Sequence, residues 1–195
     1  MSLLAKNPNR LSFMRQESLR VAGPSPELFA YIQRHRLDLA MVQAHAGYLN
    51  IALAAFMADT FLFDCDGEPA AVIEALLFDH EREEFTADLV AWPLSDPWAF
   101  ATAMGDRDGA AILGPVNMVQ RGGQPLAVHR TPLDWLKAEC TGCVALKPAA
   151  GEWLLKAGGP YLAEDVEHGR ELRQLLGPDA MRHRILIPHH EARAA

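Results

Sequence analysis

The chain has 195 residues, of which 50% are hydrophobic and 22% are charged, and its formal net charge is −7. This composition is that of an ordinary globular protein and excludes a disordered chain, a collagen and a disulfide scaffold. The length fits one domain or two small units that share a core. Only 3 cysteines occur, and the N-terminal residues lack the uninterrupted apolar segment of a secretory signal. We therefore predict a cytoplasmic protein.

The charge is unevenly distributed along the chain. Residues 1–24 carry four basic residues and one acidic residue, a net charge of +3. Residues 182–195 carry three basic residues and one acidic residue, a net charge of +2, so the rest of the chain carries −12. An acidic body repels a phosphate backbone, which argues against nucleic-acid binding. We predict that residues 1–24 form a basic, partly disordered arm and that residues 182–195 form a basic tail.

Residues 25–105 contain the first clear structural signals. A helix is predicted to begin at Ser25, which can cap it, with Pro26 at the first helical position and Glu27 near the positive end of the helix dipole. One stripe then recurs at spacings of three and four, formed by Leu28, Ile32, His35, Leu39, Val42 and Ala46. Residues 48–57 are predicted to be a second helical piece that runs into a strand.

A membrane span is not expected, although residues 39–58 contain no formally charged side chain. Gln43, His45, Gly47 and Asn50 interrupt the apolar segment, and the same pattern fits a buried helical hairpin or a helix followed by a strand.

Three apolar runs follow, at residues 61–63, 71–78 and 85–94, separated by an Asp-Cys-Asp-Gly turn and by a charged tip. Their spacing predicts a three-stranded antiparallel meander. A short helix is predicted over residues 98–104, opened by Asp96-Pro97 and closed by Gly105. The predicted fold class is therefore α+β, with an N-terminal amphipathic helix packed on an antiparallel three-stranded meander.

A smaller section with alternating strands and helices is predicted after this meander. Residues 106–124 are rich in glycine and are expected to form a loop. Residues 125–181 then alternate: strands are expected at 126–128, 143–146 and 160–163, and helices at 132–137, 152–156 and 164–176. Such βα alternation predicts parallel strands, either added to the first sheet or in a small layer of their own.

The residues Thr60-Phe61-Leu62-Phe63-Asp64-Cys65-Asp66-Gly67 join an apolar strand to two closely spaced carboxylates. They resemble the first motif of haloacid-dehalogenase-type phosphohydrolases. The resemblance implies a central parallel strand, with Asp64 as the nucleophile, Asp66 as the general acid, and Mg²⁺ between them and the phosphate. The later Lys and acidic pair of that family do not follow in the required order. A hairpin turn uses the same residues for backbone reasons, so both interpretations are kept.

Two other groups of residues could ligate a metal. Cys140-Thr141-Gly142-Cys143 supplies two thiol ligands, and a structural zinc site needs two more. Glu164, His168 and Glu171 are spaced by four and three residues and would share a helix face. Buried thiols beside a glycine turn and a solvated acidic helix face are the alternative interpretations.

The two tryptophans Trp92 and Trp98 flank two prolines, where they either lock a corner of the chain or line a groove for a ligand. No catalytic set is complete in the sequence. We therefore predict a non-enzymatic binding or accessory module without a cofactor, which self-associates through the apolar helix face of Leu28, Ile32 and Leu39 or binds a protein partner. The alternative is an Mg²⁺-dependent phosphohydrolase that uses Asp64 and Asp66.

Overall fold

The computed structural model describes residues 8–21, 23–78, 81, 83–105, 109–115, 118, 124–178 and 184–188. It combines helices and strands, which confirms the α+β class. None of the described helices is both long and apolar enough to cross a bilayer. In chain order, the elements are α1 (Pro8–Val21), α2 (Pro26–His35), α3 (Leu39–Ala46), β1 (Asn50–Met57), β2 (Thr60–Phe63), β3 (Glu68–Phe78), β4 (Glu84–Pro93), β5 (Ala101–Thr102), β6 (Ile112–Leu113), β7 (Leu126–His129), α5 (Pro132–Lys137), β8 (Cys143–Ala145), α6 (Ala150–Ala157), β9 (Tyr161–Leu162), α7 (Val166–Leu176) and β10 (Ile185–Leu186).

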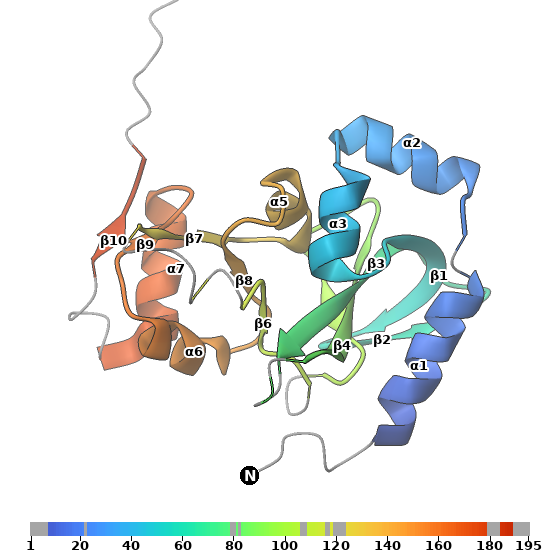
Figure 1. Cartoon of the computed structure of the whole chain (residues 1–195), viewed down its shortest axis with the longest axis horizontal. Coiled ribbons are helices and arrows are strands. Elements are labelled where there is room, and N and C mark those ends of the chain that lie inside the picture. The colour runs from blue at the N-terminus through green and yellow to red at the C-terminus, as the bar shows by residue number, and fades with distance from the viewer. Residues whose placement is uncertain are drawn as a thin grey trace, which may run out of the picture.

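The first β unit is a closed barrel with the strand order β1-β2-β5-β4-β3, which lies beside α1, α2 and α3 in Figure 1. Strand β1 pairs antiparallel with both β2 and β3, so that Ala54 is opposite Phe63 on one side and Glu68 on the other. The predicted meander is present only in part: residues 71–78 pair antiparallel with β4 as expected, but residues 61–63 pair with β1 instead of with residues 71–78. Thr60, at the start of the same strand β2, pairs with β5. The chain returns beside β1 because Gly67, without a side chain, lies directly against the backbone of Ala54.

Small side chains fill the barrel interior. Its buried cluster contains mostly alanines, together with a few larger residues: Ala52, Ala54, Ala70, Ala91, Ala101, Ala103, Phe61, Val72, Leu89 and Met14. Five strands enclose a narrow space, which small side chains fill without strain. Residues 50–57 accordingly form a strand, β1, and the helical piece predicted within 48–57 is not found there.

Helix α1 covers this barrel, where a partly disordered arm was expected. Met14 and Ser18 are buried, and the side-chain amide of Asn50 on β1 donates to the carbonyl and the hydroxyl oxygens of Ser18 at 3.2 and 3.1 Å. Arg15 binds Glu74 of β3 at 2.7 Å. Three basic residues of the predicted arm, Arg10, Arg15 and Arg20, therefore lie on a helix, while residues 1–7 and 189–195 lie outside the described residues.

The predicted stripe from Leu28 to Ala46 is divided between two helices. Ser25 caps α2 as expected and accepts the backbone N–H of Leu28 at 3.1 Å. Helix α2 ends at His35, the following residue Arg36 adopts the left-handed conformation, and Asp38 then caps α3. Within the predicted stripe, Arg36 therefore ends one helix and Asp38 begins the next.

The helix predicted over residues 98–104 is absent. Residues 101–102 form β5, which closes the barrel between β4 and β2. The residues before it form a turn in which Asp96 accepts the backbone N–H of Trp98 at 3.0 Å. Barrel closure requires a strand at this position, and this requirement prevails over the local helix signal.

The second β unit is an open sheet with the order β10-β9-β7-β8-β6. Strand β7 pairs parallel with β8 and with β9, and β10 pairs parallel with β9, whereas β6 is antiparallel to β8. The predicted βα alternation and its parallel strands are therefore present. Within the expected loop and tail, 112–113 and 185–186 form edge strands, and residues 106–108, 116–117, 119–123 and 179–183 lie outside the described residues.

Candidate ligand crevice at a strand switch point

The connections of the open sheet diverge at the carboxyl ends of its two central strands. From β7 the chain passes through α5 to β8 on one side, whereas from β9 it passes through α7 to β10 on the other side. Loops that leave adjacent parallel strands in opposite directions open a crevice at the strand ends, which is the usual ligand site of doubly wound sheets. His129 and Arg130 lie at the end of β7, and Glu164 and Asp165 follow β9.

Arg130 joins the two sides of this switch point. Its guanidinium forms a bidentate pair with Asp165 at 2.9 and 3.0 Å and binds Glu171 of α7 at 3.2 Å. Its backbone N–H donates to Glu164 at 3.2 Å. The guanidinium is also 5.5 Å from the centre of the Trp98 ring, which belongs to the turn before β5 of the barrel. Arg130 thereby fixes the strand ends and contacts the barrel unit.

Helix α7 begins beside this cluster. The side chain of Asp165 accepts the backbone N–H of His168 at 2.9 Å and caps the helix. This hydrogen bond, together with the positive charge of Arg130, holds the pKa of Asp165 below its ordinary value. Asp165 is therefore ionised at neutral pH, as the ion pair requires.

His168 is a buried lining residue of the crevice, with 3% of its surface exposed. Its Nδ1 accepts the backbone N–H of Glu164 at 3.1 Å, so a neutral ring carries its proton on Nε2. Burial is the largest cause of a lowered pKa, and the ring is therefore neutral at pH 7. The described residues provide no hydrogen-bond acceptor for the Nε2–H group.

A buried ion pair lies where the two β units meet. Lys147, which follows β8, binds Asp88 of β4 at 3.1 Å, and their side chains are only 3% and 0% exposed. Asp88 also accepts the backbone N–H groups of Leu89 and Met104. Burial raises the pKa of Asp88 to about 6, against the opposing charge of Lys147. A buried pair of this kind orients both partners and ties the barrel to the open sheet.

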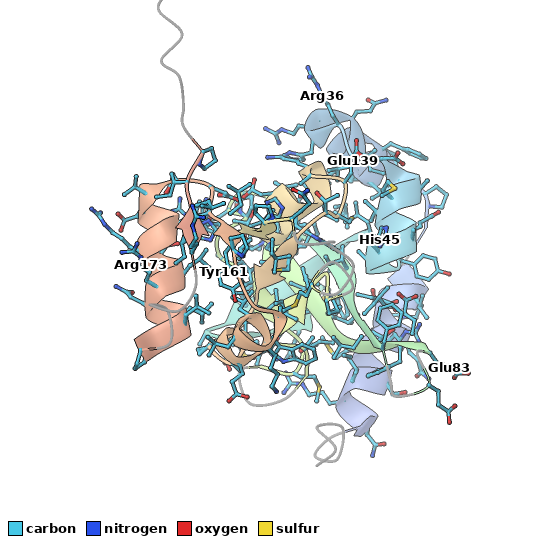
Figure 2. The ribbon with its side chains drawn as sticks, turned by 60° about the vertical axis from the view of Figure 1, so that its left-hand side comes forward. Arg36, His45, Glu83, Glu139, Tyr161 and Arg173 are labelled. Atoms are coloured by element: carbon cyan, nitrogen blue, oxygen red, sulfur yellow. The ribbon has the colours of Figure 1, made fainter. Side chains whose placement is uncertain are left out.

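The crevice encloses about 430 Å³. Apolar lining residues include Trp98, Val128, Leu146, Pro148 and Leu172, and the polar or charged ones are His129, Arg130, Lys147, His168, Glu171 and Gln174. Arg173 of α7 extends outward, away from the rest of the molecule (Figure 2). The site thus combines apolar walls and the exposed ring of Trp98 with the Nε2–H group of His168 and with the paired charges of Arg130 and Lys147.

The predicted metal ligands Glu164, His168 and Glu171 do not share one helix face, because α7 begins only at Val166, and they have other partners. Glu164 and His168 are hydrogen-bonded through the backbone N–H of Glu164, and Glu171 binds Arg130. Within the described ranges, the one group of three potential ligands close enough for a metal is Asp64, Cys65 and Asp66. Asp165, which precedes α7, and Glu171 on α7 therefore surround the guanidinium of Arg130.

The two predicted thiol ligands belong to different buried clusters. Cys140 packs in the cluster between the barrel, α2 and α5, whereas Cys143 packs in the cluster beneath α6 and α7. Burial, followed by the charge of Asp38, raises the pKa of Cys140 to about 12. Its thiol is therefore protonated at neutral pH, which disfavours metal binding. The Cys-x-x-Cys spacing reflects a tight turn, in which Gly142 has a positive φ and approaches the backbone of Ala127.

Asp64 and Asp66 lie on the exposed turn between β2 and β3. The Asp64 side chain accepts the backbone N–H of Asp66 at 2.9 Å, and the ligand atoms of Asp64, Cys65 and Asp66 are within 4.8 Å of one another. Strand β2 is one arm of an antiparallel hairpin with β1. The surroundings therefore differ from the central parallel strand that the phosphohydrolase resemblance implies.

The two predicted ligand-binding tryptophans are separated. Trp92 is completely buried, and its indole N–H donates to the hydroxyl of Tyr31 at 2.9 Å. Trp98 is 59% exposed and lines the crevice. Trp92 thus belongs to the core, and Trp98 alone of the two is placed to contact a ligand.

The sequence analysis missed Arg130, Lys147 and Asp88. A signal for Asp88 was present, because it is the one charged residue in the run 85–92. A charge within an apolar strand is costly to bury alone and therefore predicts a partner. The identity of that partner, 59 residues away, depends on the tertiary structure.

Comparisons with known proteins do not add to these observations. No protein-family model, curated protein or solved structure matches the chain.

Proposed function

We propose that this chain is a non-enzymatic binding module whose ligand site is the crevice between helix α7 and the carboxyl ends of β7 and β8, beside the switch point of the open sheet. The observation that carries the proposal is a largely apolar cavity of about 430 Å³ at the carboxyl ends of the parallel strands β7 and β8, covered by α7. Cavities of this size hold small organic molecules, and the carboxyl ends of parallel strands are their usual position.

The lining residues favour an uncharged ligand. Arg130 is neutralised by Asp165 and Glu171, and Lys147 is paired with Asp88. An anionic ligand would have to displace a carboxylate from one of these cations, and a cationic ligand would meet the guanidinium of Arg130. Apolar walls and the Nε2–H donor of His168 fit a small, flat, largely apolar molecule with one carbonyl-type oxygen.

The same contacts argue against catalysis. The carboxylate among the lining residues, Glu171, is paired with Arg130, and Nδ1 of His168 accepts a backbone N–H group. A general base needs an acceptor atom that is available to the substrate. We therefore propose binding without turnover, and self-association of the module is developed in the next subsection.

Three probes of the same size test the ligand class: acetophenone is neutral, benzoate is anionic and benzamidine is cationic. We expect acetophenone to shift the NMR signals of the Trp98 indole and of the His168 ring in a saturable way, and the two charged probes to bind at least about tenfold more weakly. Equal binding of all three probes, or shifts that do not involve these two side chains, would contradict the proposal.

A matched pair of variants locates the site. Trp98 and Phe13 are equally exposed, at 59% and 60%, but Phe13 lies on α1. We expect Trp98→Ala to weaken acetophenone binding at least about fivefold and Phe13→Ala to leave it unchanged, because an aromatic contact contributes about 1 kcal/mol. Equal effects of the two substitutions would place the binding elsewhere.

A further inference from the structure

Helix α2 presents an apolar surface that the described chain leaves uncovered. Phe29 and Tyr48 are 53% and 52% exposed, and Leu39 is 36% exposed. They lie around a groove of about 350 Å³, whose other apolar lining residues include Leu28, Ile32 and Leu49. A protruding aromatic side chain thus lies directly beside a groove that could receive another one.

The outer side of α2 also carries charges in a particular order. Glu27 lies in its first turn and Arg34 in its last turn, seven residues apart and therefore on the same side of the helix. Both are exposed, and neither forms an ion pair with another described residue. Arg36 extends outward at the end of the helix (Figure 2).

This order of charges is complementary to itself. When two copies of α2 lie antiparallel about a twofold axis, the acidic end of each helix faces the basic end of the other. The same axis brings Phe29 of each copy to the groove of the other, since the protruding ring and the groove are adjacent. Ala30, an exposed small residue in the middle of α2, allows the two helices to approach closely.

We propose that the partner of this surface is a second copy of the chain. In the resulting dimer, α2 packs antiparallel against its counterpart, Glu27 pairs with Arg34 of the partner subunit, and Phe29 enters the partner's groove. This contact lies on the barrel unit and is independent of the ligand crevice in the open sheet. Failure of one proposal therefore does not affect the other.

Sedimentation velocity of the full chain tests the dimer. At about 100 μM, well above the dissociation constant of a typical specific interface, we expect the wild type to sediment as a dimer. Phe29→Ala should raise the dissociation constant at least about tenfold, because an aromatic anchor at the centre of an interface carries much of its affinity. Phe13→Ala, with an equally exposed ring on α1, should leave the dimer intact. A wild-type monomer at this concentration would overturn the proposal.

Charge exchange tests the antiparallel arrangement. Glu27→Arg and Arg34→Glu each replace two attractive contacts per dimer with two repulsive ones, so each variant alone should dimerise about tenfold more weakly. An equimolar mixture of the two variants restores both attractive contacts in the heterodimer and should dimerise like the wild type. Both residues are exposed, so the folds of the variants should remain intact, which circular dichroism checks. A mixture that dimerises no better than the single variants would refute the antiparallel arrangement.

Discussion

The barrel and the open sheet use their buried space differently. The barrel interior is filled by apolar side chains, most of them alanine, and every strand pairs on both sides. The open sheet gathers Arg130, Glu164, Asp165 and His168 at its strand ends. In the closed barrel, the backbone hydrogen-bonding groups of each strand are paired with neighbouring strands. In the open sheet, diverging loops leave an opening at the strand ends, which is lined by side chains. The difference indicates why we place the ligand in the open sheet.

The contact between the two units has its own chemistry. Lys147 and Asp88 form a buried ion pair that links the end of β8 to β4. If the units are as dependent on each other as this pair suggests, then breaking it should reduce the stability of both. The predictions below test this dependence and the contrast between the units, from the largest expected effect to the smallest.

The substitution Lys147→Met should lower the free energy of unfolding by about 3 to 5 kcal/mol, because it leaves the carboxylate of Asp88 buried without its cation. Urea denaturation, followed by fluorescence and circular dichroism, measures the loss. The unfolding curves followed by fluorescence and by circular dichroism should also no longer coincide, because the two units would unfold less dependently on each other. Lys156→Met on the exposed side of α6 is the control, with a loss below about 0.5 kcal/mol. Equal losses would mean that the pair does not link the units.

The carboxyl group of Asp88 should titrate near pH 6, well above the ordinary value of 3.8. The folded chain then binds a proton more tightly than the unfolded chain does. This group therefore adds stability below about pH 4 that is lost as the pH rises through 6, up to about 3 kcal/mol. Carboxyl ¹³C NMR measures the pKa, and the corresponding slope of stability should be missing in Asp88→Asn. A pKa below 4 would contradict this account of the junction.

Close backbone contact in the barrel gives a third prediction. A side chain added at Gly67 would lie 2.5 Å from the carbonyl of Ala54, whereas one added at Gly23 would meet nothing within 4 Å. We expect Gly67→Ala to lower the free energy of unfolding by about 2 kcal/mol and Gly23→Ala to change it little. Thermal unfolding of both variants checks this. A similar result for the two would show that β1 and the β2–β3 turn can separate without cost.

The sequence predicted the open sheet better than the barrel. Residues 132–137 form a helix as expected, because a cap at Thr131 and Pro132 at the first helical position are local signals. The barrel depends instead on β5, whose two residues have no strand signal of their own and are placed by pairing with β4 and β2. Local patterns thus suffice for capped helices, and closure of a barrel is visible only in three dimensions.

The candidate site follows the same rule. Of Glu164 and His168, two of the residues predicted from their helical spacing, His168 lines the crevice, whereas Glu164 contacts it only through its backbone N–H, which donates to His168. Arg130, which occupies the centre of the cluster, stands 34 or more residues away from its acidic partners. The residues next to Arg130 in the sequence do not indicate an ion pair. Without that partner, the spacing of the acidic residues suggests a metal site instead.

The smallest expected effect compares equivalent helix caps in the two units. Ser25 caps α2 beside the barrel and Thr131 caps α5 in the open sheet, and each accepts a backbone N–H group at 3.1 Å. Thr131 is 2% exposed and also donates to Asp134 at 2.6 Å, whereas Ser25 is partly exposed. Water can replace a cap at the surface but not one that is buried.

Replacement by alanine should therefore cost about 0.5 to 1 kcal/mol at Ser25 and about 1 to 2 kcal/mol at Thr131, as measured by urea denaturation. The variants Ser25→Thr and Thr131→Ser keep a capping hydroxyl and serve as controls with smaller losses. Equal costs for the two alanine variants would mean that burial does not change the contribution of a cap to stability. The difference between the barrel and the open sheet in their buried polar groups would then concern only their charged residues.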